Sequence, residues 1–91
     1  MLHIVKSIEK LPLVISLLRE EDALLLVEGA IYAAHEKSQA YASIKSCVGV
    51  YVLQEDLMAR GWEHKVAKTL DIVDMAGFVD LTVTHVNSAT W

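Results

Sequence analysis

The sequence predicts an α/β fold with three layers, α/β/α, built around a mainly parallel sheet of four or five strands. Short apolar runs alternate along the chain with helix-compatible stretches, which is the order of elements that gives a parallel sheet. The run Ala23–Val27 is apolar throughout rather than alternating, as expected for a strand that helices cover on both faces. The chain has 91 residues without a linker or an internal repeat, so we expect a single domain over residues 1–91.

The first predicted elements are a strand over Leu2–Val5 and a helix that begins near Pro12. Proline suits the first turn of a helix, because its missing N–H would have no partner there in any case. The apolar spacing places three residues on the buried face of this helix: Val14, Leu17 and Leu18. After the strand Ala23–Val27, a helix is expected over Ala30–Lys37, and a second turn or helix over Ser38–Ile44.

The second half of the chain contains further predicted strands and helices. Val48–Leu53 is rich in the β-branched and aromatic residues that favour strands, and a short helix over Glu55–Arg60 follows it. Gly61 stands where a helix can end in a left-handed conformation. The remaining predictions are a strand over Leu70–Val73 and a helix over Met75–Leu81. The pattern of the tail Thr82–Trp91 is ambiguous, although Thr82–Val86 alternates like an edge strand. Because crossovers between parallel strands are right-handed, a flavodoxin-like winding is expected.

The chain is more apolar than a domain of its size requires. Hydrophobic residues, with Tyr included, make up 54% of the chain. The usual count of apolar residues omits Tyr and includes Gly; with the 3 Tyr removed and the 4 Gly added, the apolar fraction still exceeds the roughly 45–50% of typical soluble domains. A small domain has proportionally more surface than a large one and should need fewer apolar residues. Some of them are therefore expected on a surface that another chain covers, which predicts that the protein is a subunit.

Charge and composition argue against several classes of partner. The net charge is −4, and no two of the eight Lys and Arg are adjacent, so direct binding of nucleic acid by this chain alone is not expected. Every apolar run is far shorter than the about 20 residues of a membrane span, so no membrane association is expected either. The single cysteine suits a reducing compartment and predicts a cytoplasmic location.

No motif for a cofactor or a metal stands out. The chain has neither GxGxxG nor a Walker loop, and Glu28-Gly29 places a carboxylate where a phosphate would lie after the second strand. No two histidines have a metal-ligand spacing; they are His3, His35, His64 and His85. Glu55-Asp56 follows the third strand and could serve acid–base chemistry, but acidic residues in a first turn also favour the helix dipole.

Cys47 is the only candidate sulfur nucleophile, and hence the only candidate catalytic residue. Lys45 nearby would favour the reactive thiolate. However, Cys47 lies at the amino end of the third predicted strand, opposite the edge where open α/β sheets bind ligands, so a structural thiol is the favoured interpretation. Trp62 and Trp91 fit two interpretations equally: covers for the chain's own core, or anchors for a partner.

Several stretches together resemble the TusB/DsrH family of small sulfur-relay subunits. The most specific are Tyr51–Gly61, which ends in Ala-Arg-Gly, and Gly77–Thr82, which contains Phe-Val-Asp-Leu-Thr. The other similar stretches are Met1–His3, Leu25–Ala34, Val73-Asp74 and the closing Trp91. They span nearly the whole chain in the family's order.

The resemblance implies a DsrE/DsrF/DsrH-like fold and a place in a complex. Family members assemble with TusC-like and TusD-like subunits into a hexamer of two heterotrimers, which relays persulfide sulfur from a TusA-like donor to a TusE-like acceptor. The sulfur ends as the 2-thio group of the wobble uridine in certain tRNAs. The sulfur-bearing cysteine belongs to the TusD-like subunit, so this chain is not expected to be catalytic alone.

The position of cysteine separates this chain from DsrH members, whose complex works in sulfur oxidation. The resemblance implies a cysteine near the first helix in those members, but Leu13–Leu18 contains none, and Gln54–Asp56 also lacks one. This favours a structural subunit in tRNA thiolation. The alternatives are a DsrH-like persulfide carrier that uses Cys47, and a stand-alone homo-oligomer that binds a small cation or metabolite near Glu28 and Glu55. The candidate partner contacts are Ile31, Tyr32, Phe78 and Trp91.

Overall fold

A computed structural model describes residues 1–91 and contains one five-stranded sheet. The strands are β1 (Leu2–Val5), β2 (Ala23–Leu26), β3 (Val50–Leu53), β4 (Asp71–Val73) and β5 (Ser88–Thr90). All neighbouring strands are parallel, in the order β4-β3-β2-β1-β5. The chain therefore moves outward from β1 to β4 and then crosses back to place β5 on the other side of β1.

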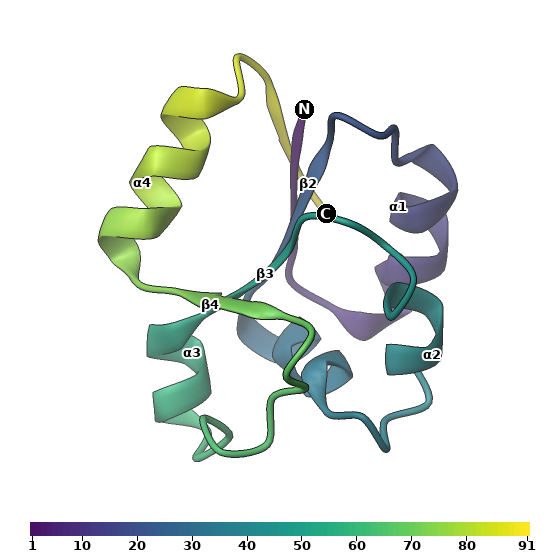
Figure 1. Cartoon of the computed structure of the whole chain (residues 1–91), viewed down its shortest axis with the longest axis vertical. Coiled ribbons are helices and arrows are strands. Elements are labelled where there is room, and N and C mark those ends of the chain that lie inside the picture. Colours follow the sequence, from purple (N-terminus) through teal and green to yellow (C-terminus); the bar gives the residue numbers. More distant parts are fainter.

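Helices lie on both faces of this sheet (Figure 1). They are the 3-10 segments η1 (Ile8–Lys10) and η2 (Glu28–Ala34), and the α-helices α1 (Leu11–Leu17), α2 (Tyr41–Ile44), α3 (Gln54–Ala59) and α4 (Met75–Thr84). In Figure 1, α1 and α2 lie on one side of the strands and α4 on the other. The predicted three-layer α/β fold with a parallel sheet is confirmed; the strand order is a finding that the sequence pattern did not predict.

The central strand β2 carries the clearest sequence signal. All four of its residues are buried, and its side chains alternate between the two faces of the sheet. Leu24 and Leu26 belong to a cluster of 15 buried residues on the α1 side, whereas Ala23 and Leu25 belong to a cluster of five on the opposite face. A strand packed on both faces has no polar side, which is why the run is continuously apolar.

One predicted helix face is partly wrong. In α1 the buried residues are Leu11 and Val14, with Ile15 and Leu18 partly buried, whereas Leu17 is 48% exposed. Leu11, Val14, Ile15 and Leu18 follow the i, i+3, i+4, i+7 spacing of one helix face, and Leu17 falls outside it.

The segment after β2 is helical, as predicted, but forms a 3-10 helix in place of an α-helix. Glu28–Ala34 forms a 3-10 segment rather than an α-helix over Ala30–Lys37, and only Tyr41–Ile44 of the second predicted stretch is α-helical. The prediction for Gly61 is confirmed, since its φ of +65° lies in the left-handed region after α3.

The ambiguous tail is resolved against an edge strand over Thr82–Val86. Helix α4 continues to Thr84, and the last strand is Ser88–Thr90, which pairs with β1. The Thr-Val-Thr alternation also fits the end of a helix on which the valine is exposed. The helix begins at the capping residue Asp74 and continues through this stretch.

Candidate functional site

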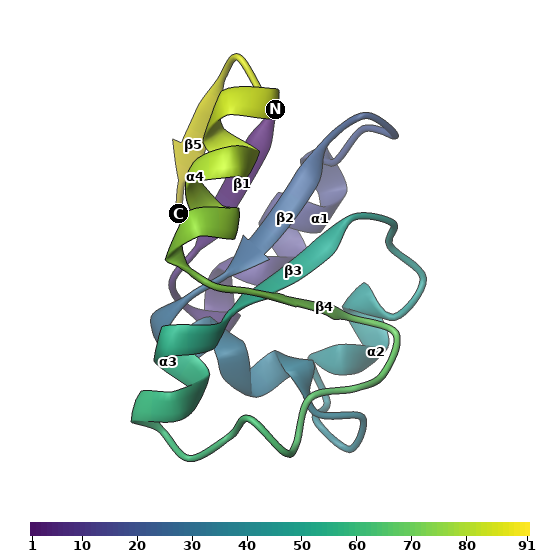
Figure 2. The ribbon, with the colours of Figure 1, turned by 60° about the vertical axis from the view of Figure 1, so that its left-hand side comes forward.

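The two faces of the sheet are covered unequally. The larger cluster lies under η1, α1, η2 and α2, whereas the five-residue cluster on the other face packs against Phe78 and Leu81 of a single helix, α4. In Figure 2, α4 lies in front of β1 and β5, and no helix lies in front of β2 and β3. Ile4 and Tyr51, on this face of β1 and β3, are only partly buried. The α4 side of the sheet is therefore the thinly covered side of the domain.

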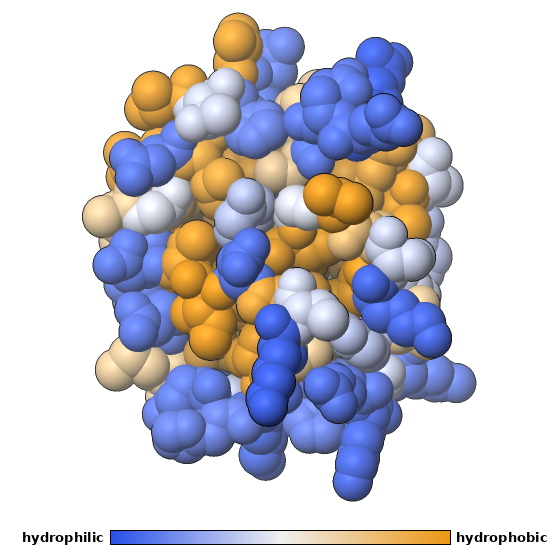
Figure 3. Space-filling model, in the orientation of Figure 1, coloured by the Kyte–Doolittle hydropathy of each residue, from blue (hydrophilic) through white to orange (hydrophobic).

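Helix α4 is itself apolar on its outer side. Its ten residues include one charged residue, Asp80, and none of them is fully buried. Met75, Val79 and Val83 follow each other at intervals of four residues and are 51%, 57% and 77% exposed. We call these three residues the α4 surface. Figure 3 shows apolar side chains over the upper left and the middle of the molecule, whereas its lower end is hydrophilic. Exposed apolar residues that follow one stripe of a helix are typical of an interaction surface, so the α4 surface has the character of an interface.

Two local features fix α4 in place. The Asp74 carboxylate accepts a hydrogen bond from the backbone N–H of Gly77 at 2.9 Å and caps the helix. A Cβ atom at Gly77 would lie 3.0 Å from the Cβ of Val73, so a glycine there allows the first turn of α4 to approach β4 closely. The helix that carries the exposed apolar row is thus set by specific contacts.

The four predicted partner contacts lie on three segments: two on η2, one on α4 and one after β5. Ile31 is fully buried in the larger cluster, so its prediction as a contact residue is wrong: no surface remains for a partner to touch. Tyr32 is 36% exposed, and its ring meets Trp62 edge-on at 4.8 Å. Phe78 is half-buried against the smaller cluster, and Trp91 packs against the larger one. A partner contact at the last three stays a prediction.

The sequence pattern missed the α4 surface itself. On this helix the sequence predicts a partner contact at Phe78 alone. The signal that could have found Met75, Val79 and Val83 was the scarcity of charge over residues 75–84 together with apolar residues at i, i+4 and i+8.

Cys47 lies just before β3, at the amino end of the strand, and is half-buried. Burial raises the pKa of its thiol above the ordinary value. The Sγ–H donates to the backbone oxygen of Ser43 at 3.7 Å. It lines a cavity of about 500 Å³ together with Arg19, Glu20 and three apolar side chains. Since a raised pKa disfavours the thiolate, these surroundings do not prepare Cys47 as a nucleophile.

The carboxylates at the opposite edge of the sheet hold backbone groups. Asp56 Oδ2 accepts the N–H of Glu28 at 2.6 Å, and Glu55 Oε2 accepts the N–H of Met75 at 3.3 Å. Each carboxylate thereby links α3 to another element, η2 or α4. Neither caps the first turn of α3 itself. Glu28 has a φ of +46°, which is unusual for a residue other than glycine, and the bond to Asp56 helps to hold it there. No group of three or more His, Cys, Asp or Glu side chains in residues 1–91 converges on a point where a metal could sit.

His3 is a core residue with a defined set of partners. Its ring is 3% exposed; Nε2 lies 3.2 Å from Asp22 Oδ2, and Nδ1 accepts from Trp91 Nε1 at 3.2 Å. Asp22 also accepts from the amino-terminal ammonium at 2.7 Å and from the N–H of Arg19. The ammonium lowers the pKa of Asp22 well below its usual range, with the Arg19 and His3 contacts adding to this and burial opposing it.

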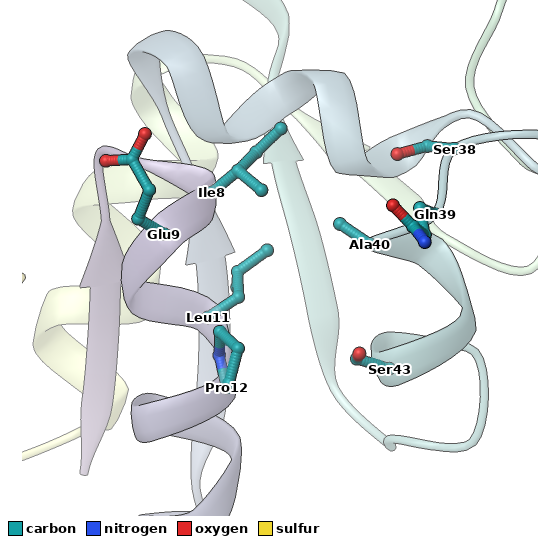
Figure 4. A pocket seen from close by; sticks show the side chains of 8 residues that line it. All are labelled: Ile8, Glu9, Leu11, Pro12, Ser38, Gln39, Ala40 and Ser43. Carbon is teal, nitrogen blue, oxygen red and sulfur yellow. The ribbon is translucent and has the colours of Figure 1, made fainter.

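A further cavity, of about 460 Å³, lies between η1, α1 and the segment that leads into α2. Figure 4 shows Ile8 and Leu11 pointing from one side toward the space that Ala40 borders from the other. Its polar lining consists of Ser38, Gln39, Ser43 and Glu9. No helix of the structure has the length and apolar composition of a membrane span.

Fold and surface together describe a small α/β domain with an exposed apolar row on one helix, and comparison with known proteins identifies its family. The family model for DsrH-like proteins matches residues 6–88. The chain therefore belongs to the DsrH-like family, which confirms the family predicted from its sequence motifs.

Curated relatives within the family carry a more specific name. The chain is 34% identical over 90 residues to Protein TusB of Salmonella dublin and to Protein TusB of Salmonella typhimurium LT2, covering 98% of this chain and 94% of each relative. Among solved structures, a protein of unknown function, MTH1491 from Methanobacterium thermoautotrophicum, superposes with a TM-score of 0.72 at 16% identity. The superposition covers 99% of this chain and 96% of that protein, and at this identity it shows a shared fold.

Proposed function

We propose that this protein is a non-catalytic structural subunit of a TusBCD-type sulfur-relay complex, which passes persulfide sulfur toward 2-thiolation of the wobble uridine in tRNA. Membership of the DsrH-like family and similarity to curated TusB proteins support a role in the tRNA sulfur relay. Its partners are TusC-like and TusD-like subunits in a cytoplasmic hexamer of two heterotrimers, which accepts sulfur from a TusA-like donor and delivers it to a TusE-like acceptor.

The observation that carries this proposal is the exposed apolar α4 surface above a sheet face that one helix covers. An isolated domain gains nothing from leaving Met75, Val79 and Val83 in water, because each forgoes half or more of the about 1.5–3 kcal/mol that full burial of such a side chain contributes. A partner subunit that packs on this face recovers that energy and shields Tyr51 and Ile4 from water as well.

The surroundings of Cys47 support a structural rather than a sulfur-carrying role. Persulfide transfer requires a thiolate that attacks a bound sulfur atom, and its rate depends on how much thiolate is present. Burial raises the pKa of the Cys47 thiol, and the chain has no other cysteine. The reactive cysteine of the complex therefore belongs to a partner, and this subunit holds and shields it.

The test is co-expression with the TusC-like and TusD-like subunits of the same organism, followed by size-exclusion chromatography with light scattering. The expected result is one species with the mass of two heterotrimers. Recovery of this chain alone, as a monomer that no partner retains, would contradict the proposal. A discrete homodimer that a metabolite stabilises against heat would instead support a stand-alone binding domain.

A second measurement separates a structural subunit from a carrier. The purified complex is incubated with a persulfide-loaded TusA-like donor, and each subunit is analysed by intact mass spectrometry. We expect the mass of this chain to stay unchanged while the TusD-like subunit gains one sulfur atom. A gain of one sulfur at Cys47 would make this chain a carrier.

A further inference from the structure

Two loops at the hydrophilic end of the molecule bring basic side chains together. A cavity of about 250 Å³ lies between residues 35–37, which follow η2, and residues 64–68, which precede β4. Its polar lining consists of His35, Glu36, Lys37, His64, Lys65 and Lys68. We call this cavity the basic pocket. It contains three of the six lysines of the chain and only one carboxylate, in a protein whose net charge is −4.

The two loops are fastened to each other by backbone and side-chain contacts. The N–H of Ala67 donates to the backbone oxygen of Ala34 at 2.8 Å, and Ala67 is buried. The hydroxyls of Tyr41 and Thr69 lie 2.9 Å apart, which adds a second link. The lysines therefore stand on segments with fixed positions, and their proximity is a property of the fold.

The aromatic side chain of Trp62 contacts two of the residues that line the pocket. The Nζ atom of Lys65 lies 5.3 Å from the centre of the Trp62 ring, and the His35 ring meets Trp62 edge-on at 5.5 Å. Trp62 is itself held by the edge of Tyr32 and by its backbone N–H, which donates to the Leu57 oxygen at 2.8 Å. The N–H of Lys37 donates to Nδ1 of His35 at 3.0 Å, which leaves Nε2 of that ring as its donor.

No carboxylate lies within 4.0 Å of any lysine ammonium group in the chain. The three lysines that line the cavity carry charge of one sign, and an anion bound in the cavity would be attracted by all three. A phosphate group suits this donor set, because its oxygens accept several hydrogen bonds at once and lysine acts on it as a mobile point charge. The cavity is smaller than the roughly 300–1,000 Å³ of pockets that enclose whole ligands, which fits a single phosphate group.

We infer that the basic pocket binds a phosphate group, carried either by a small phosphorylated compound or by a nucleic-acid chain. The wide spacing of these lysines in the sequence hides the pocket, since the fold joins segments almost thirty residues apart. This inference does not depend on the proposed sulfur-relay function, because it rests on the loops, the cavity and the charges alone.

The test is a titration of the full chain, labelled with nitrogen-15, with inorganic phosphate at low ionic strength. We expect saturable shifts of the amide signals of residues 35–37 and 64–68. The double variant Lys65→Gln/Lys68→Gln should weaken phosphate binding roughly tenfold. The matched control, Lys6→Gln/Lys10→Gln, removes the same charge from exposed lysines outside the pocket and should weaken binding about twofold or less.

Further probes identify the source of the phosphate. Two competitors are compared: uridine 5′-monophosphate, and a short single-stranded RNA without a terminal phosphate. If only the monophosphate displaces inorganic phosphate, the ligand is a phosphate monoester. If the RNA displaces inorganic phosphate too, the pocket also binds phosphodiesters. The inference is overturned if no saturable shifts occur, if both double variants weaken binding equally, or if a glutamate-rich peptide binds more tightly than any phosphate probe.

Discussion

The indole Nε1–H of Trp91 donates a hydrogen bond to Nδ1 of His3 at 3.2 Å, which joins the end of the chain to the first strand. Because Nδ1 accepts this bond, a neutral imidazole carries its proton on Nε2, which faces the Asp22 carboxylate. Both nitrogens of a buried ring are thereby satisfied. Backbone bonds from Trp91 N to Ile4 O and from Lys6 N to Trp91 O hold the same two segments together. Trp91 thus serves the chain's own fold, whatever a partner adds.

Replacing Trp91 by phenylalanine should destabilise the fold. Phe keeps a ring at the position but has no N–H, so the buried Nδ1 of His3 loses its donor. We expect the free energy of unfolding to fall by about 1–3 kcal/mol, measured by urea denaturation. In a His3→Leu background the same replacement should cost clearly less, because no ring nitrogen is left unsatisfied. Equal costs in both backgrounds would show that packing alone accounts for the effect.

Asp22 should make stability depend on pH in acid. Its folded-state pKa is depressed, chiefly by the amino-terminal ammonium, so its contribution is complete above the ordinary Asp value of about 3.9 and is lost as the pH falls below it. The variant Asp22→Asn should be less stable than the parent by about 2 kcal/mol at pH 7. Urea denaturation at pH 7 and pH 3 should show this difference narrowing in acid. A difference that stays constant with pH would mean that the carboxylate charge is not involved.

The fold was predictable where a single physical requirement determined which residue types occur in a segment. β2 is buried on both faces, and Gly61 needs a positive φ, so each has a clear signature. Where two structures share a pattern, the sequence could not choose between them. Thr82–Val86 alternates like a strand, yet the cap at Asp74 and the packing of Phe78 and Leu81 on the sheet extend the helix through most of it.

The site was less predictable than the fold, because it depends on which apolar residues remain uncovered. Ile31 and Val83 are equally apolar in sequence, but one is fully buried and the other is 77% exposed. Burial is decided by the path of distant segments, in this case by η2 packing under α3 while only one helix crosses the opposite face. The basic pocket was hidden for the same reason, since the contact between Ala34 and Ala67 is formed only by the fold.

Removing the cap of α4 should destabilise the helix that carries the apolar row. In Asp74→Ala the N–H of Gly77 loses its side-chain acceptor, and we expect a loss of about 1 kcal/mol in the free energy of unfolding. Asp74→Ser retains a capping oxygen and should lose less than half of that. Denaturation by urea, with circular dichroism as the signal, measures both. A serine variant as unstable as the alanine variant would mean that the cap is not the cause.

Cys47 should react slowly with an alkylating reagent. Burial raises the pKa of the thiol, so less thiolate is present at neutral pH than in an ordinary cysteine. With iodoacetamide at pH 7.5, mass spectrometry should show slower alkylation of Cys47 than of glutathione. The rate for Cys47 should also level off at a higher pH than the rate for glutathione. In cells that depend on this protein, Cys47→Ser should leave the 2-thiouridine content of tRNA unchanged. Fast alkylation, or a loss of 2-thiouridine, would contradict a purely structural role for this chain.

The α4 surface can be tested with a pair of matched valines. Val83 on α4 and Val48 before β3 are 77% and 83% exposed, so lysine at either position should change the free energy of unfolding of the isolated chain by less than about 0.5 kcal/mol. In an assembly the two positions differ, because a partner that covers α4 would bury the new charge at position 83. We expect Val83→Lys to weaken association with the TusC-like and TusD-like subunits at least tenfold, since an unpaired buried charge costs several kcal/mol. Val48→Lys should assemble normally. Light scattering of the co-expressed subunits over a dilution series measures both variants. If the two valines behave alike, the partner packs elsewhere, and the exposed row on α4 is not the interface.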